Sequence, residues 1–168
     1  MREHNVQTLK ATTTQNVVLL DAPSECTDSL VDALEKVGIW AYPSAFKART
    51  LSCTGLNFCK FAVSETKGLA KDIVTYLERA LPDFAEPISI SITGCSNACA
   101  HPYIVDIGLV GTMIRRGKER IKGFELICGG RLAGDKSHYS MSSGIKVTPD
   151  EAPQAIEKLL VEYQQSNF

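Results

Sequence analysis

Two short stretches decide how this chain is organised: Cys53-Thr-Gly-Leu-Asn-Phe-Cys59 and Thr93-Gly94-Cys95-Ser96-Asn97-Ala98-Cys99. Each supplies a close pair of thiols, and the sequence between the pairs is long enough to hold a helix and a strand. Two such pairs are what a chain needs to grip an iron–sulfur cluster from two sides. The spacing therefore favours a cluster held by Cys53, Cys59, Cys95 and Cys99.

Zinc, disulfides or a set of inert core thiols are the alternatives to that cluster. Zinc ribbons and fingers pair cysteines about two to four residues apart, so the longer gap between Cys53 and Cys59 fits zinc poorly. Disulfides need an oxidising compartment, and Met1-Arg2-Glu3-His4-Asn5 leads into polar sequence, not into the apolar core of a secretory signal. Cys26 and Cys128, outside the motifs, are most simply small buried apolar residues.

The residues around the cysteines resemble a known family. They run from Cys53 through Glu65-Thr66-Lys67, from Thr93 through Gly111, and through Gly129-Gly130-Arg131-Leu132, with Thr12-Thr13-Thr14-Gln15-Asn16-Val17 upstream. Together they closely resemble the siroheme and four-iron four-sulfur (4Fe-4S) region of assimilatory nitrite and sulfite reductases, over nearly the whole chain. Thr-Gly before Phe-Cys, and Glu-Thr-Lys after it, look more like the nitrite-reductase side of that family.

The resemblance implies an α+β fold in two parts. Residues 1–44 would form a partial ferredoxin-like subdomain, and residues 45–168 a mixed α/β domain that binds siroheme and a 4Fe-4S cluster. Members of the family are longer and consist of two related halves, of which this chain resembles the second, C-terminal one. In that family the first half supplies most of the basic residues that hold the siroheme carboxylates and the substrate anion. Because little sequence precedes Thr12, we expect the sheet of the first part to be incomplete, with an open edge.

The resemblance also implies chemistry for individual residues. Cys99 would bridge the cluster to the siroheme iron, and Asn97, in the turn beside it, would be a further cofactor-binding residue. Arg131 would contact an anionic cofactor because the glycines before it let the backbone approach closely, although a surface salt bridge explains an arginine equally well. The reaction implied is reduction of nitrite to ammonia or of sulfite to sulfide, with ferredoxin as a possible electron donor. No catalytic residue is assigned.

Several interpretations of function remain open from the sequence. The chain could be a compact siroheme-dependent reductase, half of a split enzyme, or a homodimer in which a second copy replaces the first half. It could also be an electron-transfer protein that holds the 4Fe-4S cluster without siroheme, or an inactive truncated half. The cysteines suffice for the cluster, whereas nothing in the sequence guarantees the siroheme.

Charge and hydropathy narrow the class of protein. Lys and Arg total 18, Asp and Glu total 19, and the net charge is -1. No apolar run approaches the ~20 residues that a membrane helix needs. We therefore expect a cytoplasmic protein that binds neither nucleic acid nor membrane.

One basic cluster stands out from this balanced composition. It comprises Arg115, Arg116, Lys118, Arg120 and Lys122, with Glu119 among them. Such a cluster could meet the carboxylates of siroheme or an acidic electron-donor protein. The sequence alone favours a solvated hairpin tip.

Hydrophobic patterning predicts the order of helices and strands. We expect strands over 11–20, 88–92, 104–110 and 124–128, with a charged hairpin over 115–123. Helices are expected after Ser24, over an apolar face that starts at Phe61 and ends before Pro82, and after a cap formed by Thr148-Pro149-Asp150-Glu151. Residues 43–50 are expected to be a linker.

Overall fold

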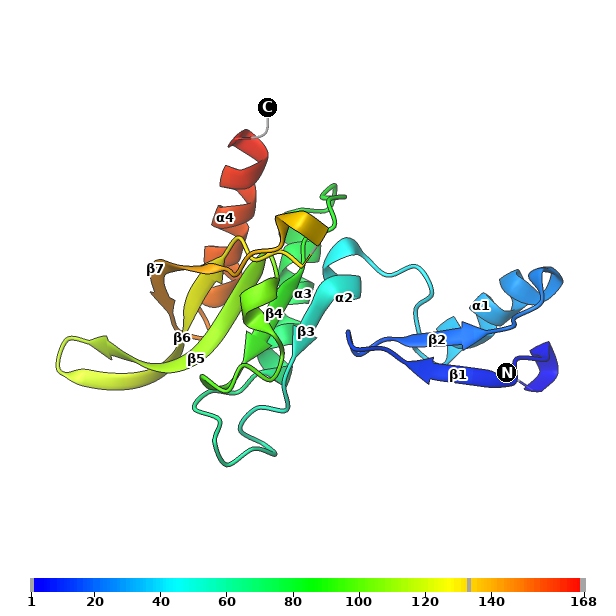
Figure 1. Cartoon of the computed structure of the whole chain (residues 1–168), viewed down its shortest axis with the longest axis horizontal. Helices are drawn as coiled ribbons and strands as arrows, with labels where there is room; N and C mark the ends of the chain where they lie inside the picture. Colours follow the sequence, from blue (N-terminus) through cyan, green and yellow to red (C-terminus); the bar gives the residue numbers. More distant parts are fainter. Residues whose placement is uncertain (1, 133, 167–168) are drawn as a thin grey trace. The chain divides into compact units, whose positions relative to one another are not determined.

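The computed structural model describes residues 2–132 and 134–166. The chain divides into two compact units, Met1–Pro43 and Ser44–Phe168. Each unit is described by itself (Figure 1). The part of the chain that the structure describes contains no helix long and apolar enough to cross a membrane.

The first unit contains a β-hairpin where one strand was expected. After the short 3₁₀ turn η1 (Arg2–His4), strand β1 (Thr8–Ala11) pairs antiparallel with β2 (Val17–Leu20). The Thr12 amide donates to the Asn16 carbonyl at 2.9 Å and closes the turn between the strands. The prediction of a single strand over 11–20 is therefore wrong, because its polar first half forms this turn. Within the described residues this sheet consists of these two strands.

One helix accompanies this hairpin. Ser24 was expected to cap it, but Ser24–Cys26 form the 3₁₀ turn η2, and helix α1 (Thr27–Lys36) begins after them without a side-chain cap. Leu30 is its buried residue. The helix ends at Lys36, and Gly38 just beyond it has a φ of +79° and donates its amide to the Glu35 carbonyl. The assignment of this unit as a ferredoxin-like subdomain stays a prediction.

The second unit is built on a five-stranded mixed sheet with the order β3-β4-β5-β6-β7. The strands are β3 (Thr50–Ser52), β4 (Ile90–Thr93), β5 (Ile107–Arg116), β6 (Glu119–Cys128) and β7 (Met141–Val147). The first three are parallel to one another, and β6 and β7 continue the sheet antiparallel. Parallel neighbours need crossover connections, and here helix α3 (Lys67–Ala80) lies between β3 and β4.

Two helices bury one face of this sheet. Helix α3 and helix α4 (Ala152–Ser166) pack with the strands in a single apolar core (Figure 1). The core includes Ile73, Leu77, Ile90, Ile92, Leu109, Phe124, Leu126, Ile156 and Leu160. Each fully buried aliphatic side chain of this kind contributes roughly 1.5–3 kcal/mol. The α+β class is confirmed.

The start of α3 differs from the expected helix. Phe61 was placed on its apolar face, yet that side chain is 63% exposed and the helix begins only at Lys67. The Glu65 carboxylate accepts the amides of Gly68 and Leu69, so it satisfies free N–H groups of the first turn. Residues 60–66 therefore lie outside the helix and form part of the loop that follows Cys53, called here the first cysteine loop.

Two further expectations need correction. The expected linker over 43–50 contains helix α2 (Ala45–Arg49), which Ser44 caps by accepting the Lys47 amide at 3.0 Å and which buries Phe46. Residue 104 belongs to the 3₁₀ turn η3 (Pro102–Ile104), and β5 begins at Ile107. Strand β5 also continues past Gly111, where we had expected it to end.

Strand β7 and the short turn η4 (Gly134–Lys136) before it had no counterpart in the sequence prediction. The strand is almost wholly exposed and ends in the buried Val147. Its pairing with β6 shifts register between Glu125 and Ile127, which blurs the period-2 pattern that would have revealed it.

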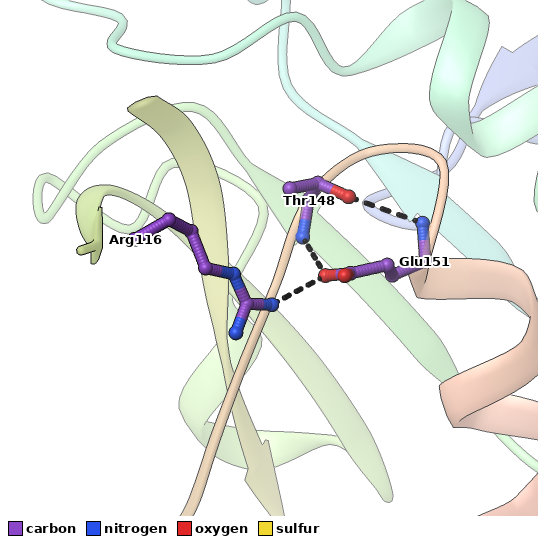
Figure 2. A network of polar contacts seen from close by, with 3 residues as sticks. All are labelled: Arg116, Thr148 and Glu151. Carbon is purple, nitrogen blue, oxygen red and sulfur yellow. Dashed lines mark hydrogen bonds and ion pairs between the residues drawn. The ribbon is translucent and has the colours of Figure 1, made fainter. Parts of the chain in front are cut away.

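The cap of α4 is confirmed and extends to another element. The Thr148 amide donates to the Glu151 carboxylate at 2.9 Å, and the Glu151 amide donates to the Thr148 hydroxyl at 3.3 Å. Arg116, at the end of β5, donates to the same carboxylate at 2.8 Å (Figure 2). The cap therefore ties the β5–β6 hairpin to the start of α4.

Replacing Glu151 by Gln should make stability less dependent on pH. The hydrogen bond from the Thr148 amide lowers the pKa of the Glu151 carboxyl below its ordinary 4.5, and the Arg116 guanidinium adds to this effect. The carboxylate thus contributes stability that is present above pH 4.5 and is lost as the pH falls through the lowered pKa. E151Q should melt below the wild type at pH 7 and close to it at pH 3 in thermal denaturation followed by circular dichroism. An equal difference at both pH values would contradict this role.

Candidate metal centre

The two cysteine motifs meet at one edge of the second unit's sheet. Cys53 directly follows β3, and Cys95 follows β4 after Gly94. These strands are parallel neighbours with Ser52 opposite Ile92, and the Cys53 amide donates to the Ile92 carbonyl at 3.0 Å. Carboxyl ends of parallel strands are where ligands of open α/β sheets usually bind. The fold therefore brings the two predicted ligand pairs to a common edge, called here the carboxyl edge.

The backbone of Gly94 connects the motifs by hydrogen bonds. Its amide donates to the Cys53 sulfur at 3.2 Å. Its carbonyl accepts the amide of Val63 at 2.7 Å and that of Ser64 at 3.3 Å. Gly94, at the start of the second motif, thus bonds to both ends of the first cysteine loop. One end is Cys53, and the other is Val63 and Ser64.

Thr66 supports Cys53 from a fully buried position. Its hydroxyl donates to the Cys53 carbonyl at 2.7 Å and lies 3.7 Å from the Cys53 sulfur. The motif Glu65-Thr66-Lys67 belongs to the family resemblance, but the sequence alone predicts no role for Thr66. A threonine just outside a cysteine loop was the available signal, since such hydroxyls often orient a thiolate.

The surroundings of Cys53 favour its thiolate. Partial burial raises the pKa of this thiol, but hydrogen bonds from the amides of Gly94 and Gly55 oppose that effect, with help from the hydroxyls of Thr66 and Thr93. The net result is a pKa below the ordinary value for cysteine. The thiolate is the form that binds iron.

Cys59 lies in a tight turn within the first loop. Gly55 adopts a φ of +65°, and its carbonyl accepts the Cys59 amide at 2.9 Å. The Cys59 side chain is partly exposed, whereas the neighbouring Phe58 is 83% exposed. The turn thus holds Cys59 near the surface of the loop.

Cys99 lies in the most strained segment of the site. Ala98 and His101, on either side of it, have φ values of +57° and +55°. A left-handed backbone costs a residue other than glycine about 1–2 kcal/mol, and such strain gathers at functional sites. The Cys99 side chain is exposed, and its thiol donates to the Asn97 carbonyl at 3.9 Å.

The remaining predicted residues lie in different places. Asn97 is exposed in the same turn as Cys99. Arg131 follows the end of β6, which runs opposite to β5, so its backbone lies toward the other edge of the sheet. There it forms a two-bond bridge with His138, and a Cβ on the preceding Gly130 would overlap the carbonyls of Tyr103 and Val105. The cofactor role of both residues stays a prediction.

Glycines make the carboxyl edge close-packed. A Cβ on Gly111 of β5 would overlap the Gly94 carbonyl, and one on Gly94 would lie 2.9 Å from Ala62. On β6, the Gly123 carbonyl accepts the buried Ser64 hydroxyl at 2.9 Å. The cysteine loop, Gly94 and the backbones of β5 and β6 are therefore closely packed here, and the absence of side chains at Gly94 and Gly111 permits it.

The donor set suits an iron–sulfur cluster. All six cysteines are unpaired thiols, and the four motif cysteines are partly or fully exposed, with Cys53 and Cys95 at the carboxyl edge. Across residues 2–132 and 134–166, no three Cys, His, Asp or Glu side chains converge on a position for a single metal ion. A four-iron cluster asks for a different arrangement, because each thiolate binds its own iron. Cys26 and Cys128 lie outside this group, and burial raises the pKa of the Cys128 thiol.

Comparison with known proteins agrees with this chemistry. Residues 45–168 match the family model described as "Nitrite and sulphite reductase 4Fe-4S domain". The chain is 36% identical to Sulfite reductase [ferredoxin] 2 of Mycolicibacterium paratuberculosis, over 90% of this chain and 28% of that protein. It is 32% identical to Ferredoxin--nitrite reductase of Synechococcus elongatus, over 92% of this chain and 30% of that protein.

A solved structure is similar as well. The structure of the Mycobacterium tuberculosis NirA protein matches 95% of this chain with a TM-score of 0.89 and 33% sequence identity. The match covers 30% of that chain. This chain therefore spans less than a third of the length of the relatives that it resembles.

Replacing Gly111 by Ala should destabilise the second unit by at least about 2 kcal/mol, because the new methyl group would overlap the Gly94 carbonyl. Urea unfolding followed by far-ultraviolet circular dichroism measures this loss of stability. Gly117→Ala is the matched control: its Cβ meets nothing within 4 Å, so only the left-handed φ of +63° should cost about 1 kcal/mol. Equal losses in the two variants would contradict close packing at Gly111.

Proposed function

The chain belongs to the nitrite and sulphite reductase family, whose 4Fe-4S domain it carries, and from this premise we propose that it passes electrons through a 4Fe-4S cluster to siroheme. The reaction served is the reduction of nitrite to ammonia or of sulfite to sulfide. The observation that carries the proposal is the hydrogen-bonded meeting of the two cysteine motifs, with the Gly94 amide donating to Cys53 at the carboxyl edge.

Four thiolates hold the cluster in this proposal: Cys53, Cys59, Cys95 and Cys99. Cys53 is the most strongly positioned of them, since it accepts the Gly94 amide and lies beside the Thr66 hydroxyl. Hydrogen bonds to a ligand sulfur draw electron density from it and raise the reduction potential of a bound cluster. Gly94 therefore tunes the potential as well as holding the loop, while the Thr66 hydroxyl fixes the backbone of Cys53 by donating to its carbonyl.

Cys99 is the residue proposed to face both cofactors. Its exposed thiol and the strained turn around it support a sulfur presented outward from the protein. Asn97 belongs to that turn, and Arg131 carries a positive charge suited to a cofactor carboxylate. Siroheme supplies the iron at which the anion is reduced, while the chain's part is to position it and exclude competing reactions.

The whole reductase requires more than this chain contributes. The relatives are more than three times as long, and basic residues for the substrate anion are proposed to come from a first-half partner or from a second copy of this chain. The relatives' names include ferredoxin, which we propose as the class of electron donor here. Six unpaired cysteines support a reducing compartment such as the cytoplasm.

The first test is an absorption spectrum of the chain purified without oxygen from a host that makes siroheme, with iron and sulfide counted. Siroheme bands with about four further irons per chain would support the proposal and justify assays with nitrite and sulfite. A cluster shoulder without siroheme bands would instead favour an electron carrier, or a half that needs its partner. Absence of both would overturn the proposal.

Replacing Cys53 or Cys95 by Ser should abolish the cluster, because each loop would lose a ligand that the carboxyl edge positions. The content of iron and of acid-labile sulfide should fall from about four per chain to a small remaining amount. Cys26→Ser and Cys128→Ser are the controls and should retain the full content, since neither cysteine belongs to the two motifs. If C128S lost iron as C95S does, the ligand assignment would be wrong.

A further inference from the structure

Strand β4 alternates between apolar and hydroxyl side chains. Its isoleucines, Ile90 and Ile92, are fully buried in the apolar core with α3 and α4. Successive side chains of a strand point to opposite faces, so Ser91 and Thr93 face away from these helices. Both are nonetheless buried, at 0% and 1% exposed, and Ser89 directly before the strand continues the alternation. We call Ser89, Ser91 and Thr93 the hydroxyl row.

The chain that follows β4 runs back along this row. Residues 95–106, called here the return segment, contain the second cysteine motif and lead to the start of β5. Each hydroxyl of the row donates to a different point of the return segment. Thr93 donates to the Cys95 carbonyl, Ser91 to the Ala100 carbonyl and Ser89 to the Asp106 carboxylate. The row therefore fixes the return segment at its beginning, its middle and its end.

The middle contact lies next to Cys99. The His101 amide donates to the Ala98 carbonyl at 2.9 Å and closes a turn. Cys99 and Ala100 are the central residues of this turn, and the residues at its two ends have left-handed backbones. The Cys99 side chain is exposed, whereas Ala100 is 1% exposed. The Ser91 hydroxyl thus ties the buried side of a strained turn to the sheet.

This bond matters because a strained turn persists only where its surroundings hold it. Without the Ser91 hydroxyl, the buried Ala100 carbonyl would lose this hydrogen bond. A buried carbonyl without a partner is costly, so the turn would rearrange toward water. Cys99 would move with Ala100, because the two residues are adjacent in the turn.

We propose that Ser91 is a positioning residue for Cys99, and that it holds the Cys99 thiol in the position from which it binds the cluster. This inference rests on the proposed function, in which Cys99 is a cluster ligand. Ser91 acts through the backbone of Ala100, since its own side chain is fully buried beneath the return segment. A ligand that is already in place loses little conformational freedom on binding. The iron bound to Cys99 is therefore held more firmly than it would be in a looser turn.

The test is Ser91→Ala in the chain reconstituted with iron and sulfide without oxygen. Equimolar ferricyanide is added, and electron paramagnetic resonance follows the 3Fe-4S product. Ferricyanide takes one electron from a 4Fe-4S cluster, one iron leaves as Fe²⁺, and a 3Fe-4S cluster on three thiolates remains. We expect S91A to form this product about tenfold faster than the wild type, the usual size of effect for a residue that orients a metal ligand. Cys99→Ala supplies the reference signal of a cluster without this ligand.

Ser140→Ala is the matched control. The Ser140 hydroxyl is also buried and also donates to a carbonyl of the return segment, that of Pro102, at 3.2 Å. Because Pro102 lies beyond the turn that contains Cys99, S140A should form the 3Fe-4S product within about twofold of the wild-type rate. Each variant loses one buried hydrogen bond, so their melting temperatures should fall alike. A difference in the cluster signal then reports position, not stability.

A second measurement needs no cluster. In the apo chain, S91A should raise the hydrogen-exchange rate of the His101 amide at least about fivefold by nuclear magnetic resonance, because this amide closes the turn. The Val63 amide, which donates to the Gly94 carbonyl at 2.7 Å, should exchange at the wild-type rate. If S91A does not fold, Ser91→Cys replaces it. Its thiol has a similar size and is a weaker donor, so both effects should be smaller and in the same direction.

Three outcomes would overturn the inference: a wild-type rate of 3Fe-4S formation in S91A, an equal acceleration in S140A, or unchanged exchange of the His101 amide. Its failure is distinguishable from failure of the proposed function. A wild-type chain that binds no iron would overturn the proposed function. An iron-loaded wild type with an unaltered S91A would overturn only the role of Ser91.

Discussion

The contacts of one backbone unit, Gly94, organise the second unit around its cysteines. Its amide donates to the Cys53 sulfur, and its carbonyl accepts the amides that return from the first cysteine loop. The same carbonyl occupies the space that a side chain at Gly111 would need. One glycine thus joins two ligand motifs and a third strand. Any residue with a Cβ at this position would collide with Ala62, so the loop and strand could not approach so closely.

The chain passes from this edge to the opposite one over the sheet face that α3 and α4 leave uncovered. From Cys95 it runs back past Ala100, whose carbonyl accepts the buried Ser91 hydroxyl, and reaches the start of β5 at Ile107. A Cβ on Gly108 would overlap the Pro102 carbonyl, which shows how closely this segment lies on the sheet. The left-handed residues beside Cys99 carry the backbone strain of this sharp turn. The buried contacts that follow in the chain offset the free energy of that strain.

The sequence predicted the elements whose signals are local. Alternating isoleucines predicted β4, the capping box predicted α4, and the cysteine spacing with its flanking motifs predicted the ligand pairs. It failed where tertiary contacts override a local pattern. Phe61 continues the apolar face of α3, but Glu65 caps the helix after it; Val18 and Leu19 suggested one strand, but the polar turn before them made a hairpin. Strand β7 carries hardly any buried residue, so its place in the sheet depends on pairing with β6.

The same limit explains what the sequence could not resolve in the basic cluster and the first cysteine loop. A list of charges does not reveal which of them face one another, and only the register pairs Arg116 with Glu119 and Arg115 with Arg120. In the cysteine loop, Phe58 and Phe61 are exposed and add nothing to the core, so the loop is fixed mainly by hydrogen bonds at its two ends. A ligand bond at Cys59 would fix its middle. Because such a bond forms only when the loop is folded, cluster binding and loop order must stabilise each other.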